Sequence, residues 1–188
     1  MNRSNSSFRI TKIRKEDVAA AEKIGAKIKL LGRCIIDGEN VTVLVAPFML
    51  SASSALSGVS GVYNAVEVVG EPIGNVMFYG QGAGAGATAS AVVGDLMQIM
   101  RSGTSCKAPS FKRSEYNKDS FLAFKSQSYF AVRGVDADTV RKIFGNIEII
   151  PSEELSFVSA SLSEAEIQAL CAEIVSLGGE ILSRIRLL

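Results

Sequence analysis

Histidine does not occur anywhere in the 188-residue sequence. Its absence excludes serine–histidine triads, histidine general bases and every zinc site that needs a histidine ligand. It also excludes a pH switch based on an imidazole that titrates near neutrality. No other cluster of residues in the sequence has the spacing of metal ligands, so we expect no metal site.

Cysteine is scarce, with only Cys34, Cys106 and Cys171 in the chain. An odd and widely spaced set does not form a disulfide framework, and it indicates a reducing compartment. The first ten residues lack the apolar stretch of a secretory signal, and the longest apolar run, residues 41–50, is too short to cross a bilayer. We therefore expect a cytoplasmic protein with no membrane partner.

An excess of charge of one sign is also lacking, because 20 basic side chains face 19 acidic ones. Proteins that bind nucleic acid by neutralising phosphates need a basic domain, so we expect no nucleic-acid partner. Basic residues do outnumber acidic ones locally between residues 101 and 125. We interpret this segment as a solvated linker, with an anion-binding strip as the alternative.

Hydrophobic residues make up 47% of the chain, which is enough for a core without metals or disulfides. The pattern of elements predicts the α+β class, with a mixed sheet and helices followed by a ferredoxin-like unit. We divide the chain into a disordered tail (1–8), a first part (9–102), a linker (103–125) and a second part (126–188).

Two hairpins and two helices are predicted in the first part. Asp17 is placed to cap a helix that ends at Gly25, and Asp37-Gly38 is a strong hairpin signal. The helix that ends near Arg101 is apolar on nearly all sides, which is typical of a buried helix. The strands of the two hairpins are expected at residues 27–36 and 40–46, and at residues 65–69 and 75–79.

The second part has the element order βαββαβ, which is the ferredoxin-like split unit. Its second helix begins at Ser163-x-x-Glu166, the spacing of a capping box, and ends at Gly178-Gly179. The predicted elements are a strand at 128–134, a helix at 138–144, strands at 146–150 and 155–162, the helix from Ser163, and a strand at 180–188.

A glycine series between a predicted strand and a predicted helix has the clearest chemical meaning. Gly80, Gly82, Gly84 and Gly86 alternate with other residues in GQGAGAG (residues 80–86). Such a loop lets a ligand approach the backbone, and the following helix offers free N–H groups at its positive end. The alternative is close packing of a helix rich in small residues against a sheet.

No acid–base pair is apparent elsewhere in the sequence. Lys27 and Lys29 alternate along a strand, so both can face solvent. Asp95 lies within the apolar helix, where a buried, hydrogen-bonded carboxylate is the expected interpretation. We therefore assign no catalytic residue in this chain.

Several segments together resemble bacterial homoserine dehydrogenases. They are DVAAAEKIG (17–25), IKLLG (28–32), GVSGVYNAV (58–66), FYGQGAG (78–84) and TASAVV (88–93) followed by Asp95. The family has a V-x-G-x-x-N-A-V loop and a Tyr-Gly-x-Gly-Ala-Gly loop that leads into Thr-Ala-Ser-Ala-Val. The matches keep their order over residues 9–102, and the final βαββαβ unit looks like the ACT-type regulatory module of many members.

The resemblance implies NAD(P)-dependent interconversion of L-homoserine and L-aspartate 4-semialdehyde, a step of threonine and methionine biosynthesis. In the family, the glycine loop closes over the nicotinamide end of the cofactor, which makes Gly84 the expected contact and gives Gly80 and Gly82 the role of shaping the loop. The family's N-terminal NAD(P)-binding domain and proton-transferring lysine would lie upstream of Phe8. The resemblance therefore implies residues 9–102 as the back part of the catalytic domain, inactive alone.

Partners follow from the same resemblance and from the uncovered sheet edges. We expect a homodimer, and a separate front-half subunit is a further option. The alternative function is a non-catalytic regulatory or assembly module that binds an amino acid or a partner subunit. The second part departs from typical ACT modules, since residues 135–139 read VDADT where those modules have Asp-x-Pro-Gly.

Overall fold

The computed structural model describes residues 13–38, 40–103 and 120–188. The chain forms two compact units, one of Met1–Ser57 with Glu115–Leu188 and the other of Gly58–Ser114. The predicted tail at residues 1–8 and most of the predicted linker lie outside the described residues.

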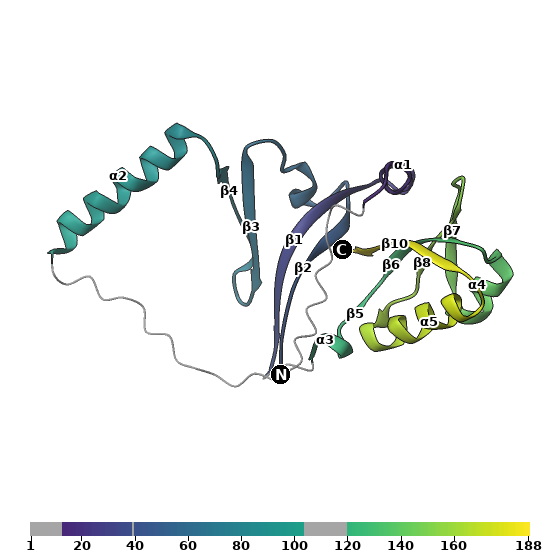
Figure 1. The fold of residues 1–188 in the computed structure, drawn as a ribbon. Helices are drawn as coiled ribbons and strands as arrows, with labels where there is room; N and C mark the ends of the chain where they lie inside the picture. Colours follow the sequence, from purple (N-terminus) through teal and green to yellow (C-terminus); the bar gives the residue numbers. More distant parts are fainter. Residues whose placement is uncertain (1–12, 39, 104–119) are drawn as a thin grey trace. The chain divides into compact units, whose positions relative to one another are not determined.

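The first unit begins with helix α1 (Lys15–Lys23) (Figure 1). The helix starts before Asp17, which we expected at its cap; Arg14 is the capping position and Asp17 lies in the first turn. The Asp17 carboxylate still accepts a hydrogen bond from the Arg14 backbone N–H at 2.9 Å, so it satisfies one of the free donors from inside the helix. Gly25 follows the helix with φ of 66°, a left-handed conformation that favours glycine.

The predicted hairpin at Asp37-Gly38 is confirmed. Strands β1 (Ala26–Asp37) and β2 (Asn40–Ser51) pair in antiparallel register from Ala26 opposite Ser51 to Asp37 opposite Asn40. The second strand runs five residues past its predicted end at Ala46, through Pro47. Alternate side chains of its second half pack on one face with Leu31, Leu56, Phe121 and Phe124, which explains the extension. These buried residues are Leu44, Ala46, Phe48 and Leu50.

The C-terminal part contains the predicted βαββαβ order. Its strands form an antiparallel sheet in the order β10-β6-β8-β7, the 4-1-3-2 arrangement of a ferredoxin-like unit. The elements are β6 (Ser128–Arg133), α4 (Ala137–Phe144), β7 (Ile147–Ile150), β8 (Leu155–Ser159), α5 (Glu164–Ser176) and β10 (Glu180–Leu187). A short helix α3 (Ser120–Ala123) precedes β5 (Lys125–Ser126), which pairs with β9 (Leu162–Ser163).

The capping box at Ser163 and Glu166 is confirmed. The Ser163 hydroxyl accepts from the Glu166 backbone N–H at 3.3 Å, and the Glu166 carboxylate accepts from the Ser163 backbone N–H at 2.7 Å. These hydrogen bonds hold the pKa of Glu166 below its usual range. Two donors at the start of α5 are thereby satisfied.

A parallel pairing joins the two parts of the chain in one sheet. Phe48 and Met49 of β2 lie beside Arg186 and Leu187 of β10, so the six strands run in the order β1-β2-β10-β6-β8-β7. The fold is therefore α+β with a mixed sheet. The sequence pattern contains no signal for this long-range contact, and the division at residue 102 did not anticipate it.

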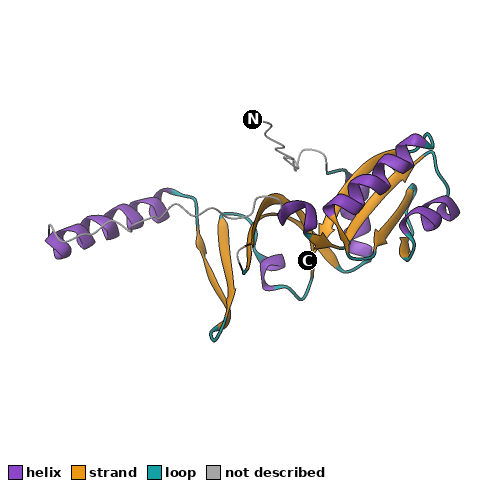
Figure 2. Ribbon diagram, turned by 90° about the horizontal axis from the view of Figure 1, so that it is seen from below, coloured by secondary structure: helices purple, strands orange, loops and turns teal. Residues whose placement is uncertain are grey.

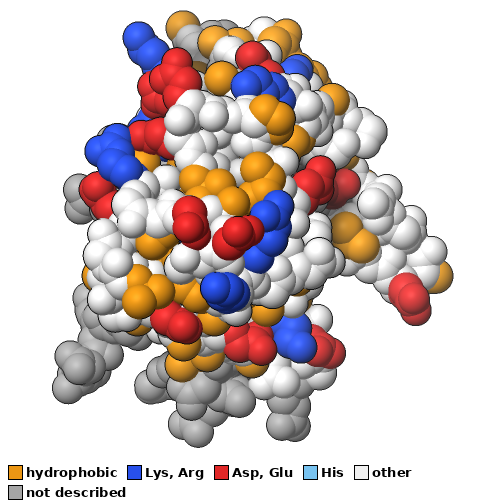
Figure 3. Space-filling view, turned by 90° about the vertical axis from the view of Figure 1, so that its right-hand side faces the viewer, with side chains coloured by type: hydrophobic (Ala, Val, Ile, Leu, Met, Phe, Trp, Pro, Cys, Tyr) orange, Lys and Arg blue, Asp and Glu red, His pale blue; other side chains and the backbone are white. Residues whose placement is uncertain are grey.

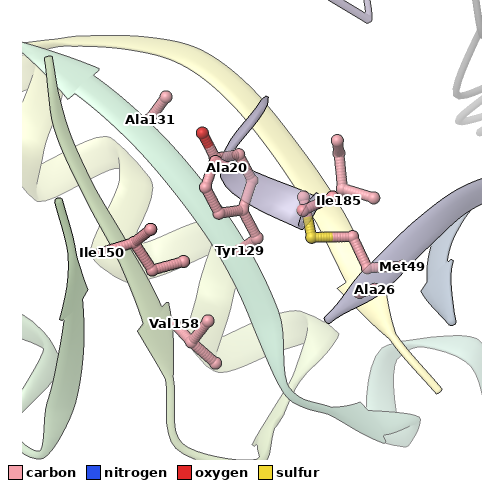
Figure 4. Close-up of a cluster of buried hydrophobic side chains, with 9 residues drawn as sticks. Ala20, Ala26, Met49, Tyr129, Ala131, Ile150, Val158 and Ile185 are labelled. Atoms are coloured by element: carbon pink, nitrogen blue, oxygen red, sulfur yellow. The ribbon is translucent and has the colours of Figure 1, made fainter. Parts of the chain in front are cut away.

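The two faces of the C-terminal strands are covered by different helices (Figures 1 and 2). On one face, Phe130, Phe144 and Phe157 form an aromatic cluster with ring centroids 5.1–5.3 Å apart, beneath α4 and α5. The other face packs against α1, as Figure 4 shows for part of this cluster. Its buried members are Ala20, Ala21, Ala26, Met49, Tyr129, Ala131, Ile150, Val158 and Ile185.

Asp17 is the polar centre of the face beneath α1, with no exposed surface. It accepts hydrogen bonds from the Ser183 hydroxyl at 2.5 Å and the Tyr129 hydroxyl at 3.3 Å, and it forms an ion pair with Arg14 at 3.1 Å. Burial raises the pKa of Tyr129 to about 12, so this hydroxyl stays protonated at neutral pH and donates. One carboxylate thus connects α1 to β6 and β10.

A second buried carboxylate holds the end of the sheet. Glu164, at the start of α5, forms ion pairs at 2.6 Å with both Arg184 and Arg186 of β10. Arg186 stands beside Phe48 in the parallel pairing, so this cluster lies next to the contact between β2 and β10. The opposite charges offset the cost of burying Glu164, whose pKa remains below its usual range despite the desolvation that opposes this shift.

The second unit contains the hairpin β3 (Tyr63–Gly70) and β4 (Gly74–Gln81) and the helix α2 (Ala85–Ser102). Both predicted strands and the helix are present. The expectation that the helix is buried is wrong for the described chain, because none of its side chains is buried and Leu96 is 54% exposed. Apolar composition makes burial favourable, but burial requires a surface that packs on every side of the helix.

We predict that Asp17→Asn destabilises the first unit by about 3–5 kcal/mol, because it leaves Arg14 without its buried counter-charge. The measurement is the free energy of unfolding from urea titration. Asp138→Asn is the matched control, since it breaks an exposed ion pair with Arg141. It should cost no more than about 1 kcal/mol. Equal effects of the two substitutions would contradict the role given to Asp17.

Candidate functional site

The glycine series lies where β4 passes into α2. In the hairpin, Tyr63 lies opposite Gln81 and Asn64 opposite Gly80, and the Gly82 N–H donates to the Val62 carbonyl at 3.0 Å. The ladder therefore continues one residue beyond the last residue of β4. The loop from Gly80 to Gly84 is held against β3 over its first half before the helix starts.

Gly84 is the capping residue of α2 and has φ of 116°, a conformation that side chains of L-residues rarely adopt. Its carbonyl accepts from the Thr88 backbone N–H at 3.1 Å and from the Thr88 hydroxyl at 3.0 Å. No side chain caps the helix, so N–H groups of its first turn point toward the loop at the positive end of the helix. A polar or anionic group could be received there.

The other glycines of the series differ in what surrounds them. A Cβ atom on Gly82 would lie 1.6 Å from Nδ2 of Asn64, so only glycine fits at this position. A Cβ on Gly80 or Gly86 would meet nothing within 4 Å. The bare backbone at Gly80 is thus open to an approaching group, whereas that at Gly82 is covered by a side chain.

The hairpin has two chemically different faces at this end. Tyr63 and Tyr79 stack on one face, with ring centroids 4.9 Å apart and an angle of 5° between the rings. Asn64 lies on the other face with Gly80 and Gly82, because side chains alternate along a strand. One face is thus aromatic, and the other presents open backbone with one carboxamide side chain.

The remaining candidate residues do not join this loop. Asp95 is exposed on α2, so the buried carboxylate that we expected there is wrong. Lys27 is exposed and Lys29 half-buried in β1 of the first unit. The described ranges contain no group of three or more side chains of the types that ligate metals. Most basic residues of the predicted anion-binding strip lie at positions 104–119, outside the described residues.

The cysteines show no sign of reactivity where the structure describes them. Cys34 is exposed, and Cys171 is half-buried with its pKa raised by burial, which disfavours the thiolate. Cys106 lies outside the described ranges.

The first unit contains a cavity of about 490 Å³ between its N-terminal hairpin and β10. Its lining includes Ile24, Met49, Gln127 and Leu187, and no acidic or basic side chain. It therefore has no group that could transfer a proton.

Two further surface features bear on possible partners. Acidic and basic side chains are interspersed on the face shown in Figure 3. Among the helices that the structure describes, none combines the length and apolar character required to cross a membrane.

Asn64 is the residue whose importance the sequence pattern did not reveal. It was interpreted together with Tyr63 as ordinary packing at the edge of a strand. The available signal was the register of the second hairpin, because residues 70 and 74 flank its turn and place Asn64 opposite Gly80. That register depends on which residues form the turn, and this becomes certain only in the folded hairpin.

Comparison with known proteins gives consistent matches. A family model described as homoserine dehydrogenase matches residues 4–97. The homoserine dehydrogenase of Synechocystis sp. is 48% identical over 88 residues, which are 45% of this chain and 20% of the relative. That of Neisseria gonorrhoeae is 32% identical over 173 residues, which are 89% of this chain and 40% of the relative.

The fold comparison extends over nearly the whole chain. The crystal structure of a homoserine dehydrogenase from Thiobacillus denitrificans matches with a TM-score of 0.80 and 27% identity. The match covers 95% of this chain and 46% of the solved chain, so the chain spans less than half of the length of these relatives. Since the family model covers half of the 188 residues, this chain belongs to the homoserine dehydrogenase family.

Proposed function

We propose that the chain forms the nicotinamide-facing part of a homoserine dehydrogenase active site. The reaction is the NAD(P)-dependent interconversion of L-homoserine and L-aspartate 4-semialdehyde, which belongs to amino-acid biosynthesis. The observation that carries the proposal is the open glycine loop between β4 and α2, which lies within the region matched by the family model.

The residues of the loop fit a planar cofactor ring. Gly80 has open space where a side chain would stand, and Gly84 adopts a backbone conformation suited to glycine. A flat ring can therefore approach the main chain closely at Gly80, with Gly82 and Gly84 setting the course of the loop. Homoserine dehydrogenases use NAD(P), which supplies hydride-transfer chemistry when bound.

The work of these residues is binding and orientation. The backbone wall excludes water from one side of the ring, and the N–H groups at the start of α2 offer hydrogen bonds to a polar substituent. No acidic or basic side chain lies between Gly80 and Thr88. We therefore propose that the proton donor and acceptor come from parts of the enzyme outside the loop.

The C-terminal unit supports a second candidate function. Its 4-1-3-2 sheet with two helices on one face has the arrangement of an ACT-like module. We propose that residues 126–188 form such a module and bind an amino acid or an assembly partner. In this case the chain regulates or completes an enzyme rather than supplying its catalytic groups.

We also propose that the chain forms a homodimer through β1 and β2. One face of this hairpin is apolar and exposed, with Leu30, Val43 and Val45 each at least 49% exposed. β1 is also the edge strand of the six-stranded sheet, so its outer backbone groups have no neighbouring strand within the described sheet. A second copy can cover both the apolar face and the edge.

The first test of the proposed function combines turnover with binding. We expect no homoserine-dependent reduction of NAD or NADP by the 188-residue chain, because the described loop contains no proton-transferring group. We expect NADPH to shift the backbone amide resonances of Gly80, Gly82 and Gly84 in a ¹⁵N NMR titration. Steady turnover in proportion to pure protein would show that catalytic groups are present in this chain.

Two glycine variants serve as a matched pair for this titration. Gly84→Ala should abolish the shifts, since a side chain at φ of 116° is strained and displaces the start of α2. Thr88→Val should preserve them apart from local changes, because the backbone hydrogen bond to Gly84 remains. Shifts located only in the first unit would argue against the glycine loop as the cofactor site.

The second candidate function predicts thermal stabilisation by an amino acid. Threonine or methionine at about 100 times its Kd should add about 2.7 kcal/mol to the stability of the first unit, since a ligand that binds only the folded state stabilises it. The measurement is the melting temperature with each amino acid, with D-threonine as the control. A flat response to every amino acid would count against ligand sensing.

The dimer predicts a concentration-dependent mass. Light scattering at micromolar concentration should give about twice 19.9 kDa for the chain. Val43→Glu should give the monomer, because it places a charge in the apolar face. Val175→Glu, at an exposed position of α5, is the control and should remain dimeric. A monomeric wild-type chain would refute this interface.

A further inference from the structure

Asn64 occupies the space directly above the Gly82 backbone. A Cβ atom on Gly82 would lie 1.6 Å from Nδ2, 2.7 Å from Cγ and 3.3 Å from Cβ of Asn64. The three distances show that the terminal amide, and not the strand itself, fills this space. The carboxamide thus rests on the loop where a side chain of residue 82 would otherwise stand.

The contact lies within a single rigid frame. Asn64 pairs with Gly80 across the hairpin, and the Gly82 N–H donates to the Val62 carbonyl on the same strand as Asn64. The Gly82 peptide is thereby fixed in two ways, by a backbone hydrogen bond from below and by a packed amide on its face. Gly80 carries no such cover, because nothing lies within 4 Å of its absent side chain.

We infer that Asn64 is a positioning residue for the glycine loop, whose side chain packs on Gly82 and leaves the backbone at Gly80 as the open side. This rests on the proposed function, in which the loop faces the nicotinamide ring. Loss of the amide would free the Gly82 peptide to move. The ring would then meet a loop that no longer has one defined conformation, at a cost in affinity.

A double-mutant cycle between the two positions tests the inference in the 188-residue chain. Gly82→Ala introduces a methyl group that overlaps the Asn64 amide, so the residue-82 amide should exchange with solvent about tenfold faster, equivalent to about 1.4 kcal/mol. Adding Asn64→Ala removes Nδ2 and Cγ and leaves only a tight methyl contact at 3.3 Å. The double variant should therefore recover exchange close to that of wild type.

Single variants separate positioning from mere packing. Asn64→Ala should speed exchange at Gly82 and weaken NADPH binding by about tenfold. Asn64→Asp keeps the shape of the side chain, so it should preserve slow exchange at Gly82. Gly80→Ala is the matched control, since its methyl group enters open space and should leave exchange at residue 82 unchanged.

The outcomes separate this inference from the proposed function. If Gly82→Ala is tolerated beside Asn64, or if the double variant is no better than Gly82→Ala, Asn64 has no positioning role. An unchanged NADPH affinity in Asn64→Ala, alongside faster exchange, would also overturn it. If wild type binds no NADPH while the cycle shows coupling, the proposed function fails and the contact of Asn64 with the loop stands.

Discussion

The parallel pairing of β2 with β10 is the contact on which the first unit depends. It places the N-terminal hairpin beside the C-terminal strands, and the Leu188 N–H extends it with a hydrogen bond to the Met49 carbonyl at 3.0 Å. The two ends of the described chain thereby share one sheet. Asp17 secures the same junction on one face, because its carboxylate is bonded to β6 and β10 from α1.

This arrangement changes how a C-terminal module would influence the rest of the enzyme. A module on a flexible linker could move independently, whereas strands of a common sheet move together. Any ligand bound by residues 126–188 therefore acts on the N-terminal hairpin through backbone hydrogen bonds and the buried ion pairs of Glu164. The glycine loop belongs to the other unit, where the hairpin register holds it locally.

Local signals in the sequence identified most elements. Asp37-Gly38, the capping box at Ser163 and the βαββαβ order were all confirmed, because each depends on residues close in the chain. The start of α1 and the exposure of α2 were not predicted correctly. Asp17 was expected to cap the helix, yet it also satisfies Ser183, a partner 166 positions away that no local pattern could reveal.

The sequence by itself determined the glycine series, the family resemblance and the absence of histidine chemistry, since these depend only on residue identity and spacing. Only the tertiary structure decided that β2 joins β10 and that Asn64 covers Gly82 but not Gly80. The physical reason is the same in both cases. Strand register and long-range pairing are selected by packing and backbone hydrogen bonds across the folded chain, which no short stretch of sequence contains.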